Sequence, residues 1–159
     1  RAPARGDIAL LTAGWQQPRR KLRGVRSAHA CREFPMLNPN VPAWFEIPTI
    51  DLDRAQAFYE RVLETSLTRE RMGGTDLAVF PRGGKPNSSG ALIHAGDCEP
   101  SVQGSVVYLG LADIRPALER IGAHGGDVFV PRTQLPGGSG FFAQFRDCEG
   151  NRVGLWSPA

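Results

Sequence analysis

The sequence of 159 residues contains little cysteine and no long apolar run. Its three cysteines, Cys31, Cys98 and Cys148, are widely spaced without a C-x-x-C pair, which argues against a disulfide framework and a zinc knuckle. Cys98 and Cys148 lie beside acidic residues, which raise a thiol pKa, so we expect no nucleophilic cysteine. No stretch approaches the roughly 18 apolar residues of a membrane-spanning helix. These features favour a protein of the reducing cytoplasm with no membrane partner.

Basic charge is concentrated at the start of the chain. Residues 1–36 contain eight basic and two acidic residues, a charge of +6, whereas the other 123 residues contain eleven basic and fourteen acidic residues, a charge of −3. The overall charge of +3 therefore does not indicate a basic globular domain. We expect residues 1–35 to be a basic leader, disordered or added upstream of a natural start at Met36. Because this leader lacks interleaved aromatic residues, we expect no nucleic-acid partner; an interaction module that binds nucleic acid through it is an alternative.

From residue 42 onward the hydrophobic pattern occurs twice. In the first unit, alternation at 43–50 predicts a strand, and apolar residues at helical spacing predict a helix capped by Asp53. Three short strands should follow, at 67–72, 76–80 and 90–95. The second unit repeats this order, with a strand at 106–111, a helix capped by Asp113, and strands at 127–130, 141–146 and 152–156. The pattern predicts an α+β domain over residues 36–159, built from two β-α-β-β-β modules at about 42–98 and 104–158.

Short motifs occur throughout these two modules. They include WFEIP at 44–48, DLDRA at 51–55, GAL at 90–92, VYL at 107–109 and FRDCEGNRVGLW at 145–156. They resemble the vicinal oxygen chelate superfamily, which includes glyoxalase I, bleomycin resistance proteins and extradiol dioxygenases, and are most similar to small uncharacterised bacterial glyoxalase-like proteins. The resemblance implies two modules that form a curved mixed sheet, or cup, with the helices packed outside. It also implies a homodimer.

The resemblance also implies positions for metal ligands. Metal-dependent members place His or Glu ligands on four central strands, and the matching positions here are Trp44, His94, Val106 and Gly154. Only His94 can bind a metal, and Glu46, two residues from Trp44, could add an oxygen. Since Zn²⁺, Ni²⁺ and Fe²⁺ sites use three or more protein donors, we expect no cofactor, with a divalent metal as the alternative.

Strand alternation predicts which side chains face the cup. We expect the apolar sets Phe45/Ile47, Ala91/Ile93, Val107/Leu109/Leu111 and Val153/Leu155 to pack under the helices. The opposite set should then line the cup: Trp44, Glu46, Leu92, His94, Val106, Tyr108, Gly154 and Trp156. Aromatic rings, a carboxylate, an imidazole and a glycine that leaves room suit a planar or cationic ligand. Alternatively, the two tryptophans fill the cup, Tyr108 lies at its rim, and Glu46 and His94 pair with each other or with Arg152.

Two main functions are compatible with these residues. The first is a small-molecule binding protein of the bleomycin-resistance type without a complete metal site, whose ligand contacts Trp44, Glu46, His94, Tyr108 and Trp156. The second is a metal-dependent lyase or isomerase of the glyoxalase kind, or a dioxygenase relative, with Glu46 as general base and His94 as metal ligand or general acid. Whether the chain is an enzyme stays open at this point. The glycine-rich stretch at 137–140 is expected to be a loop that could cover the cup.

Overall fold

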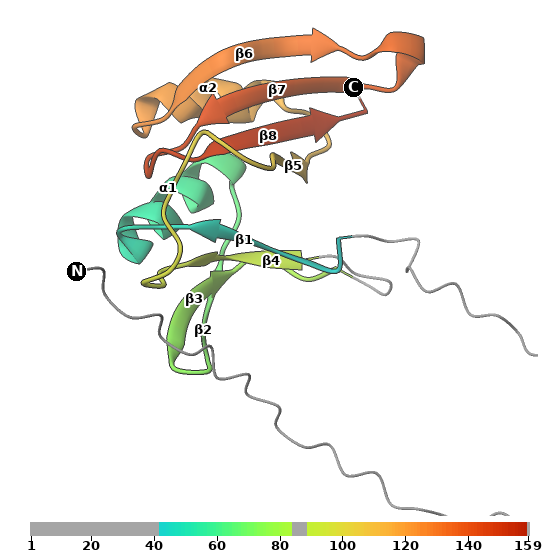
Figure 1. Cartoon of the computed structure of the whole chain (residues 1–159). Helices are drawn as coiled ribbons and strands as arrows, with labels where there is room; N and C mark the ends of the chain where they lie inside the picture. Colours follow the sequence, from blue (N-terminus) through green and yellow to red (C-terminus); the bar gives the residue numbers. More distant parts are fainter. Residues whose placement is uncertain (1–41, 84–88, 159) are drawn as a thin grey trace, which may run out of the picture. The chain divides into compact units, whose positions relative to one another are not determined.

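The computed structural model describes residues 42–83 and 89–158 (Figure 1). The expected leader, residues 1–35, lies outside the described residues. Within the described ranges, no helix combines the length and the apolar character needed to cross a membrane.

The first module forms sheet A. Its elements are β1 (Trp44–Pro48), α1 (Leu52–Leu63), β2 (Thr68–Met72), β3 (Thr75–Val79) and β4 (Ser89–Ile93). The strand order is β1-β4-β3-β2, with β1 parallel to β4 and the other pairs antiparallel.

The second module forms sheet B with the same arrangement. It contains β5 (Val107–Gly110), α2 (Arg115–Ala123), β6 (Asp127–Gln134), a short 3₁₀ turn (Pro136–Gly138), β7 (Phe141–Arg146) and β8 (Arg152–Ser157). Its strand order is β5-β8-β7-β6, with β5 parallel to β8. The predicted α+β class and the two β-α-β-β-β modules are confirmed. The eight strands form two separate four-stranded sheets, which do not close into a barrel.

Helix α1 begins two residues earlier than the sequence pattern predicts. The carboxylate of Asp51 accepts the backbone N–H groups of Asp53 and Arg54, both at 3.0 Å, and is therefore the N-cap. The prediction that Asp53 caps this helix is wrong, because a second acidic residue stands at the true cap position. In the second module Asp113 accepts the backbone N–H of Arg115, the first residue of α2, but the N-cap is Ile114, so the predicted cap lies one residue too early.

Strand β6 extends beyond the predicted segment at 127–130. It continues through Pro131 to Gln134, with one register shift against β7 before that proline and a second shift that spans it. A proline removes one ladder hydrogen bond, which an edge strand tolerates because only one of its sides is paired. Because β6 is an edge strand of sheet B, it continues past Pro131, and the predicted end at residue 130 is too early.

One face of each sheet packs into a common core with both helices. Sheet A contributes Ile47, Ala78 and Leu92, and sheet B contributes residues such as Phe145 and Leu155. Figure 1 shows α1 between the two sheets. The face of each sheet that is turned away from this core is called its outer face below. Because both sheets bury their inner faces in the same core, their outer faces lie on different sides of it.

Strand alternation is confirmed for β1, β5 and β8 but is wrong for β4. Leu92 pairs with Ile47 and lies in the common core, whereas Ala91 pairs with Glu46. Ala91 and Ile93 belong to a second apolar cluster on the outer face of sheet A, against which Trp44 packs. All five residues of β4, including Ser89, are buried, so no exposed polar residue in this strand distinguishes one face from the other.

Candidate functional site

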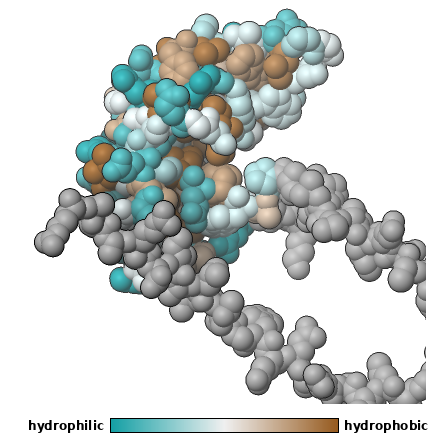
Figure 2. All heavy atoms as spheres, in the orientation of Figure 1, coloured by the Kyte–Doolittle hydropathy of each residue, from teal (hydrophilic) through white to brown (hydrophobic). Residues whose placement is uncertain are grey.

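Three aromatic side chains line a cavity on the outer face of sheet B. Tyr108, Phe142 and Trp156, together with Leu135, surround a volume of about 310 Å³. The rings of Tyr108 and Phe142 lie edge to face, with centroids 6.3 Å apart and planes at 63°. Tyr108 is 44% exposed and Trp156 is 38% exposed, values that are high for large aromatic residues in a folded chain. Figure 2 shows hydrophobic patches among hydrophilic residues in the part of the molecule where sheet B lies.

Hydrogen bonds hold two of these rings in place. The indole N–H of Trp156 donates to the backbone oxygen of Ser139 at 3.1 Å, so the glycine-rich loop borders the cavity. The side-chain amide of Gln144 donates to the Tyr108 hydroxyl. These contacts leave the ring faces accessible while the polar atoms are satisfied, which is the arrangement of a preformed binding surface.

Gly154 makes room for a protein side chain rather than for a ligand. A Cβ atom at this position would lie 2.3 Å from the Tyr108 ring, because Tyr108 and Gly154 are opposite each other in the parallel β5–β8 pair. The expectation that this glycine leaves room in the cup is therefore wrong. The space above it is occupied by the aromatic ring that forms part of the cavity.

Polar groups lie next to this aromatic cavity. Gln144 on β7 is buried, and its side-chain oxygen accepts a hydrogen bond from the Arg152 guanidinium Nε at 3.0 Å. The same guanidinium lies 5.5 Å from the centre of the Phe129 ring, which is 44% exposed. Sequence reasoning missed Phe129, Phe142 and Gln144 as members of this face. Their strands have apolar residues on both faces, so only the register with β8 reveals which side chains share a surface with Trp156.

Trp44 and Glu46 lie on β1, on the outer face of sheet A. The Trp44 indole N–H donates to the Glu46 carboxylate at 3.2 Å, and Glu46 is exposed. The Arg82 guanidinium lies 5.9 Å from the centre of the Trp44 ring and 3.3 Å from the Glu70 carboxylate. The chain therefore already places a cation against Trp44.

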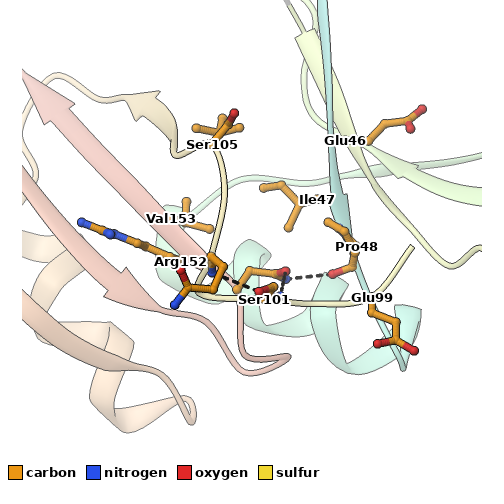
Figure 3. Close-up of a pocket in the computed structure, with 11 residues that line it drawn as sticks. Glu46, Ile47, Pro48, Glu99, Ser101, Ser105, Arg152 and Val153 are labelled. Carbon is orange, nitrogen blue, oxygen red and sulfur yellow. Dashed lines mark hydrogen bonds between the residues drawn. The ribbon is translucent and has the colours of Figure 1, made fainter. Parts of the chain in front are cut away.

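His94 does not lie with Glu46. It follows β4, and its Nδ1 is 2.9 Å from the backbone oxygen of Thr49. It lines a broad depression of about 880 Å³ together with Asp51, Arg69 and other residues, whereas Glu46 lines a separate pocket of about 110 Å³. Arg152 also lines the pocket that contains Glu46, but Figure 3 shows the Arg152 side chain directed away from Glu46. Within the described residues the structure thus brings Tyr108 and Trp156 together and keeps Trp44, Glu46 and His94 apart from them.

The four positions that correspond to metal ligands do not fit a metal ion. Trp44, Val106 and Gly154 offer no donor side chain, and His94 is held at the Thr49 backbone oxygen. Across residues 42–83 and 89–158, no group of three His, Cys, Asp or Glu side chains is arranged to hold a metal. A site that binds a transition metal needs three or more protein donors, and this set supplies one.

A buried turn between β7 and β8 fixes the position of the candidate site. Asp147 accepts the backbone N–H groups of Glu149, Gly150 and Asn151 through one carboxylate oxygen and the Tyr59 hydroxyl, at 2.7 Å, through the other. Asn151 donates to the backbone oxygen of Pro48 at 2.8 Å, and so connects the start of β8 with the end of β1. This turn joins the two modules immediately before Arg152.

Glu149 and Cys148 lie in the same turn. Burial alone would raise the pKa of Glu149, but hydrogen bonds from the Arg54 guanidinium, at 2.6 Å, and from the backbone of Asp51 and Ile50 lower it. Burial and the adjacent Asp147 and Glu149 raise the pKa of Cys148 to about 12. Burial and Asp97 also raise the pKa of Cys98, which confirms the expected effect of neighbouring acids on both thiols.

Residues 42–155 match the model of the glyoxalase/bleomycin resistance protein/dioxygenase superfamily, which covers both modules. The chain belongs to this superfamily. The sequence motifs that resemble the vicinal oxygen chelate superfamily are thereby confirmed as family features. A comparison with curated proteins found no match.

Solved structures of superfamily members share the fold. Glyoxalase I from Zea mays is 20% identical, with a TM-score of 0.53 over 73% of this chain and 45% of the maize chain, so this chain spans less than half of that protein. TioX from Micromonospora sp. ML1 is 24% identical, with a TM-score of 0.54 over 73% of this chain and 97% of TioX. TnmS3 from Streptomyces sp. CB03234, an antibiotic binding protein, is 21% identical, with a TM-score of 0.53 over 74% of this chain and 94% of TnmS3. At these identities the superfamily structures support the fold alone.

Proposed function

We propose that this superfamily member binds a small organic ligand with an aromatic ring on the outer face of sheet B, without a complete metal site. The observation that supports the proposal is the cavity lined by Tyr108, Phe142 and Trp156, in which Tyr108 and Trp156 are exposed although their polar atoms are hydrogen-bonded. Exposed, preorganised aromatic surface is costly for a folded chain and is typical of binding sites. The similarity to an antibiotic binding protein agrees with this proposal.

Fluorescence of Trp156 tests the proposal. In a variant in which Trp15 and Trp44 are replaced by Phe, Trp156 is the single tryptophan, and planar aromatic compounds should quench its emission in a saturable way. The substitution Trp156→Ala in the natural chain should weaken binding, measured by calorimetry, about tenfold or more, because it removes one wall of the cavity. Trp44→Phe then distinguishes two forms of the site: an unchanged affinity indicates that sheet B of one chain forms it alone, and a weakened affinity indicates that Trp44 of a second copy contributes to it. Failure of every compound in a broad aromatic panel to bind would contradict the proposal.

The metal-dependent lyase or isomerase is the alternative function. It would require Glu46 and His94 to act on one substrate, and these residues line different pockets. No contact in the described residues favours this alternative. Elemental analysis of the chain purified without chelators distinguishes the two functions, because a stoichiometric transition metal would support the enzyme and contradict a metal-independent binding protein.

A homodimer could complete the site. The outer faces of sheets A and B lie on different sides of one chain, so Trp44 and Glu46 of that chain do not reach the cavity at Trp156. A second copy could place its sheet A against sheet B of the first copy, and its Trp44 would then form another wall. We propose this arrangement on the basis of the superfamily resemblance and the exposed aromatic face, and we propose a cytoplasmic location on the basis of cysteine usage.

A further inference from the structure

We infer that Arg152 makes the site selective for aromatic ligands that have a carboxylate or another anionic group. This inference rests on the proposed function, because it assigns the chemical class of the ligand that the outer face of sheet B would bind. It differs from the sequence-based expectation of an aromatic or cationic ligand in the sign of the ligand charge.

Along β8, the outer face of sheet B changes from cationic to aromatic. Arg152, Gly154 and Trp156 lie on this face at alternate positions, and residues two apart on a strand are about 7 Å apart. The Tyr108 ring covers Gly154, and Gln144 hydrogen-bonds to both Tyr108 and Arg152. The guanidinium of Arg152 is thus next to the Tyr108 ring, which forms one wall of the aromatic cavity, and only the Gln144 side chain connects the two. A ligand of one or two fused rings with an acidic substituent matches this separation.

Arg152 is a cation without a carboxylate partner. It forms no ion pair with any residue in the described part of the chain, and its protein contacts on this face are the Gln144 oxygen and the Phe129 ring. By contrast Arg146, its neighbour across the β7–β8 pair, lies 3.7 Å from the Asp127 carboxylate. The outer face of sheet B therefore has one positive charge that no acidic side chain neutralises. A guanidinium in this state binds planar carboxylates through two parallel hydrogen bonds.

The backbone of Arg152 is fixed before any ligand binds. Its N–H donates to the backbone oxygen of Ser101 at 3.2 Å, and the preceding residue, Asn151, is bonded to both Ser101 and Pro48. Gln144 accepts hydrogen bonds from Nε and one terminal nitrogen of the guanidinium, which leaves the edge between the two terminal nitrogens, with one N–H from each, for a ligand carboxylate. A side chain that is already held in place loses little conformational entropy on binding, which favours it as a specificity determinant.

The acidic residues nearest in the fold do not reverse this preference. Glu46 and Glu99 line a pocket with Arg152, but Figure 3 shows both carboxylates directed away from its guanidinium. On sheet B, a cationic ligand would be repelled by the positive charge of Arg152, which has no carboxylate partner. On sheet A it would have to compete with Arg82 for the Trp44 ring.

Three naphthalene derivatives of equal size test the inference with the full chain. The probes are naphthalene-2-carboxylate, its neutral amide and 2-naphthylmethylammonium, and their dissociation constants are measured by calorimetry at low and moderate salt. We expect the carboxylate to bind about tenfold tighter than the amide, because a charge-assisted hydrogen bond strengthens binding by about a factor of ten. The cation should bind weakest, because its charge has the same sign as that of Arg152. Arg152→Gln should abolish the difference between carboxylate and amide while leaving the affinity for the amide unchanged.

Arg146→Gln is the matched control, since it removes one positive charge from the same face but from a side chain that already has an acidic partner. It should preserve the preference for the carboxylate. Equal binding of all three probes, or tightest binding of the cation, would overturn the inference and leave the proposed aromatic site intact. If no probe binds to the folded chain, both the inference and the aromatic site fail. If Arg146→Gln removes the preference as fully as Arg152→Gln, the general charge of the face, and not Arg152, determines the ligand.

Discussion

At the scale of single residues, Glu149 shows how a buried carboxylate can be stabilised. Its side chain is fully buried, yet it accepts hydrogen bonds from two backbone N–H groups and from Arg54, whose side chain is half exposed. A buried carboxylate with several donors stays ionised, whereas one without them becomes protonated. The acidic residue that follows Cys148 in the sequence therefore joins the two modules and takes no part in the candidate site.

The lowered pKa of Glu149 predicts a specific dependence of stability on pH. Because the folded pKa lies below the unfolded value of about 4.3, ionised Glu149 stabilises the fold above that pH. This contribution is lost as the pH falls through the folded pKa. Glu149→Gln should lower the free energy of unfolding at pH 7 by about 1–3 kcal/mol, and the difference from the natural chain should shrink toward pH 3. Urea unfolding at a series of pH values measures both effects.

Glu119→Gln provides the comparison for this experiment. Glu119 is exposed on α2, and its replacement should change stability by less than about 0.5 kcal/mol at any pH. A constant difference between Glu149→Gln and the natural chain from pH 7 to pH 3 would show that the hydrogen bonds of Glu149 do not depend on its charge.

At the scale of elements, glycines in β4 and β8 accommodate aromatic rings from the neighbouring parallel strands. A Cβ atom at Gly90 would lie 2.5 Å from the Phe45 ring, and one at Gly154 would lie 2.3 Å from the Tyr108 ring. In both cases the glycine and the aromatic residue are opposite each other in the pair. The Phe45 ring lies toward the common core, whereas the Tyr108 ring lies on the outer face. The same pairing of a glycine with an aromatic ring therefore supports core packing in one module and the candidate site in the other.

Substitution of Gly154 tests this role. Gly154→Ala should displace the Tyr108 ring, reduce stability by about 1–3 kcal/mol and weaken aromatic binding about tenfold. Gly110→Ala is a suitable control, because Gly110 lies on the adjacent strand opposite Trp156 and a Cβ there would contact nothing within 4 Å. Thermal unfolding and calorimetric titration of both variants provide the measurements. Equal effects of the two substitutions would contradict the proposed role of Gly154.

The elements also show how far the sequence predicts the fold and the site. The apolar stripe of α1 and the alternation of β1, β5 and β8 are visible in sequence, because each has polar residues on one side and apolar residues on the other. Strand β4 has no such contrast, and therefore its faces were assigned the wrong way round. The aromatic cavity depends on β7, whose Phe142 and Gln144 are identified only by their pairing with β8. Pairing between distant segments is not encoded in local periodicity.

At the scale of the whole molecule, the aromatic face of sheet B is more exposed than the other large apolar surface described here. The second apolar cluster, on the outer face of sheet A, contains residues that are at most 8% exposed, whereas Phe129, Tyr108 and Trp156 are 38–44% exposed. Exposed aromatic surface of this kind is typical of contacts with a ligand or with another subunit.

We expect the chain to form a homodimer. Light scattering coupled to size exclusion should give a mass of twice 17.3 kDa at micromolar concentrations. If sheet A of one copy completes the site on sheet B of the other, then mixing the chains Trp44→Ala and Trp156→Ala should partly restore aromatic binding, because each mixed dimer contains one intact site. A monomer at all accessible concentrations, or a dimer in which mixing restores no binding, would contradict this arrangement.

The proline in β6 also affects how copies of this chain can associate. An edge strand with free backbone groups can act as a template for strands of other chains and lead to fibrils. Pro131 and the adjoining register shifts interrupt that template at one edge of sheet B, and charged Arg69, Glu70 and Arg71 line the corresponding edge strand β2 of sheet A. Two of the four edge strands, β2 and β6, are thus protected against edge-to-edge aggregation. The chain can therefore expose an aromatic face to solvent with a reduced risk of uncontrolled polymerisation.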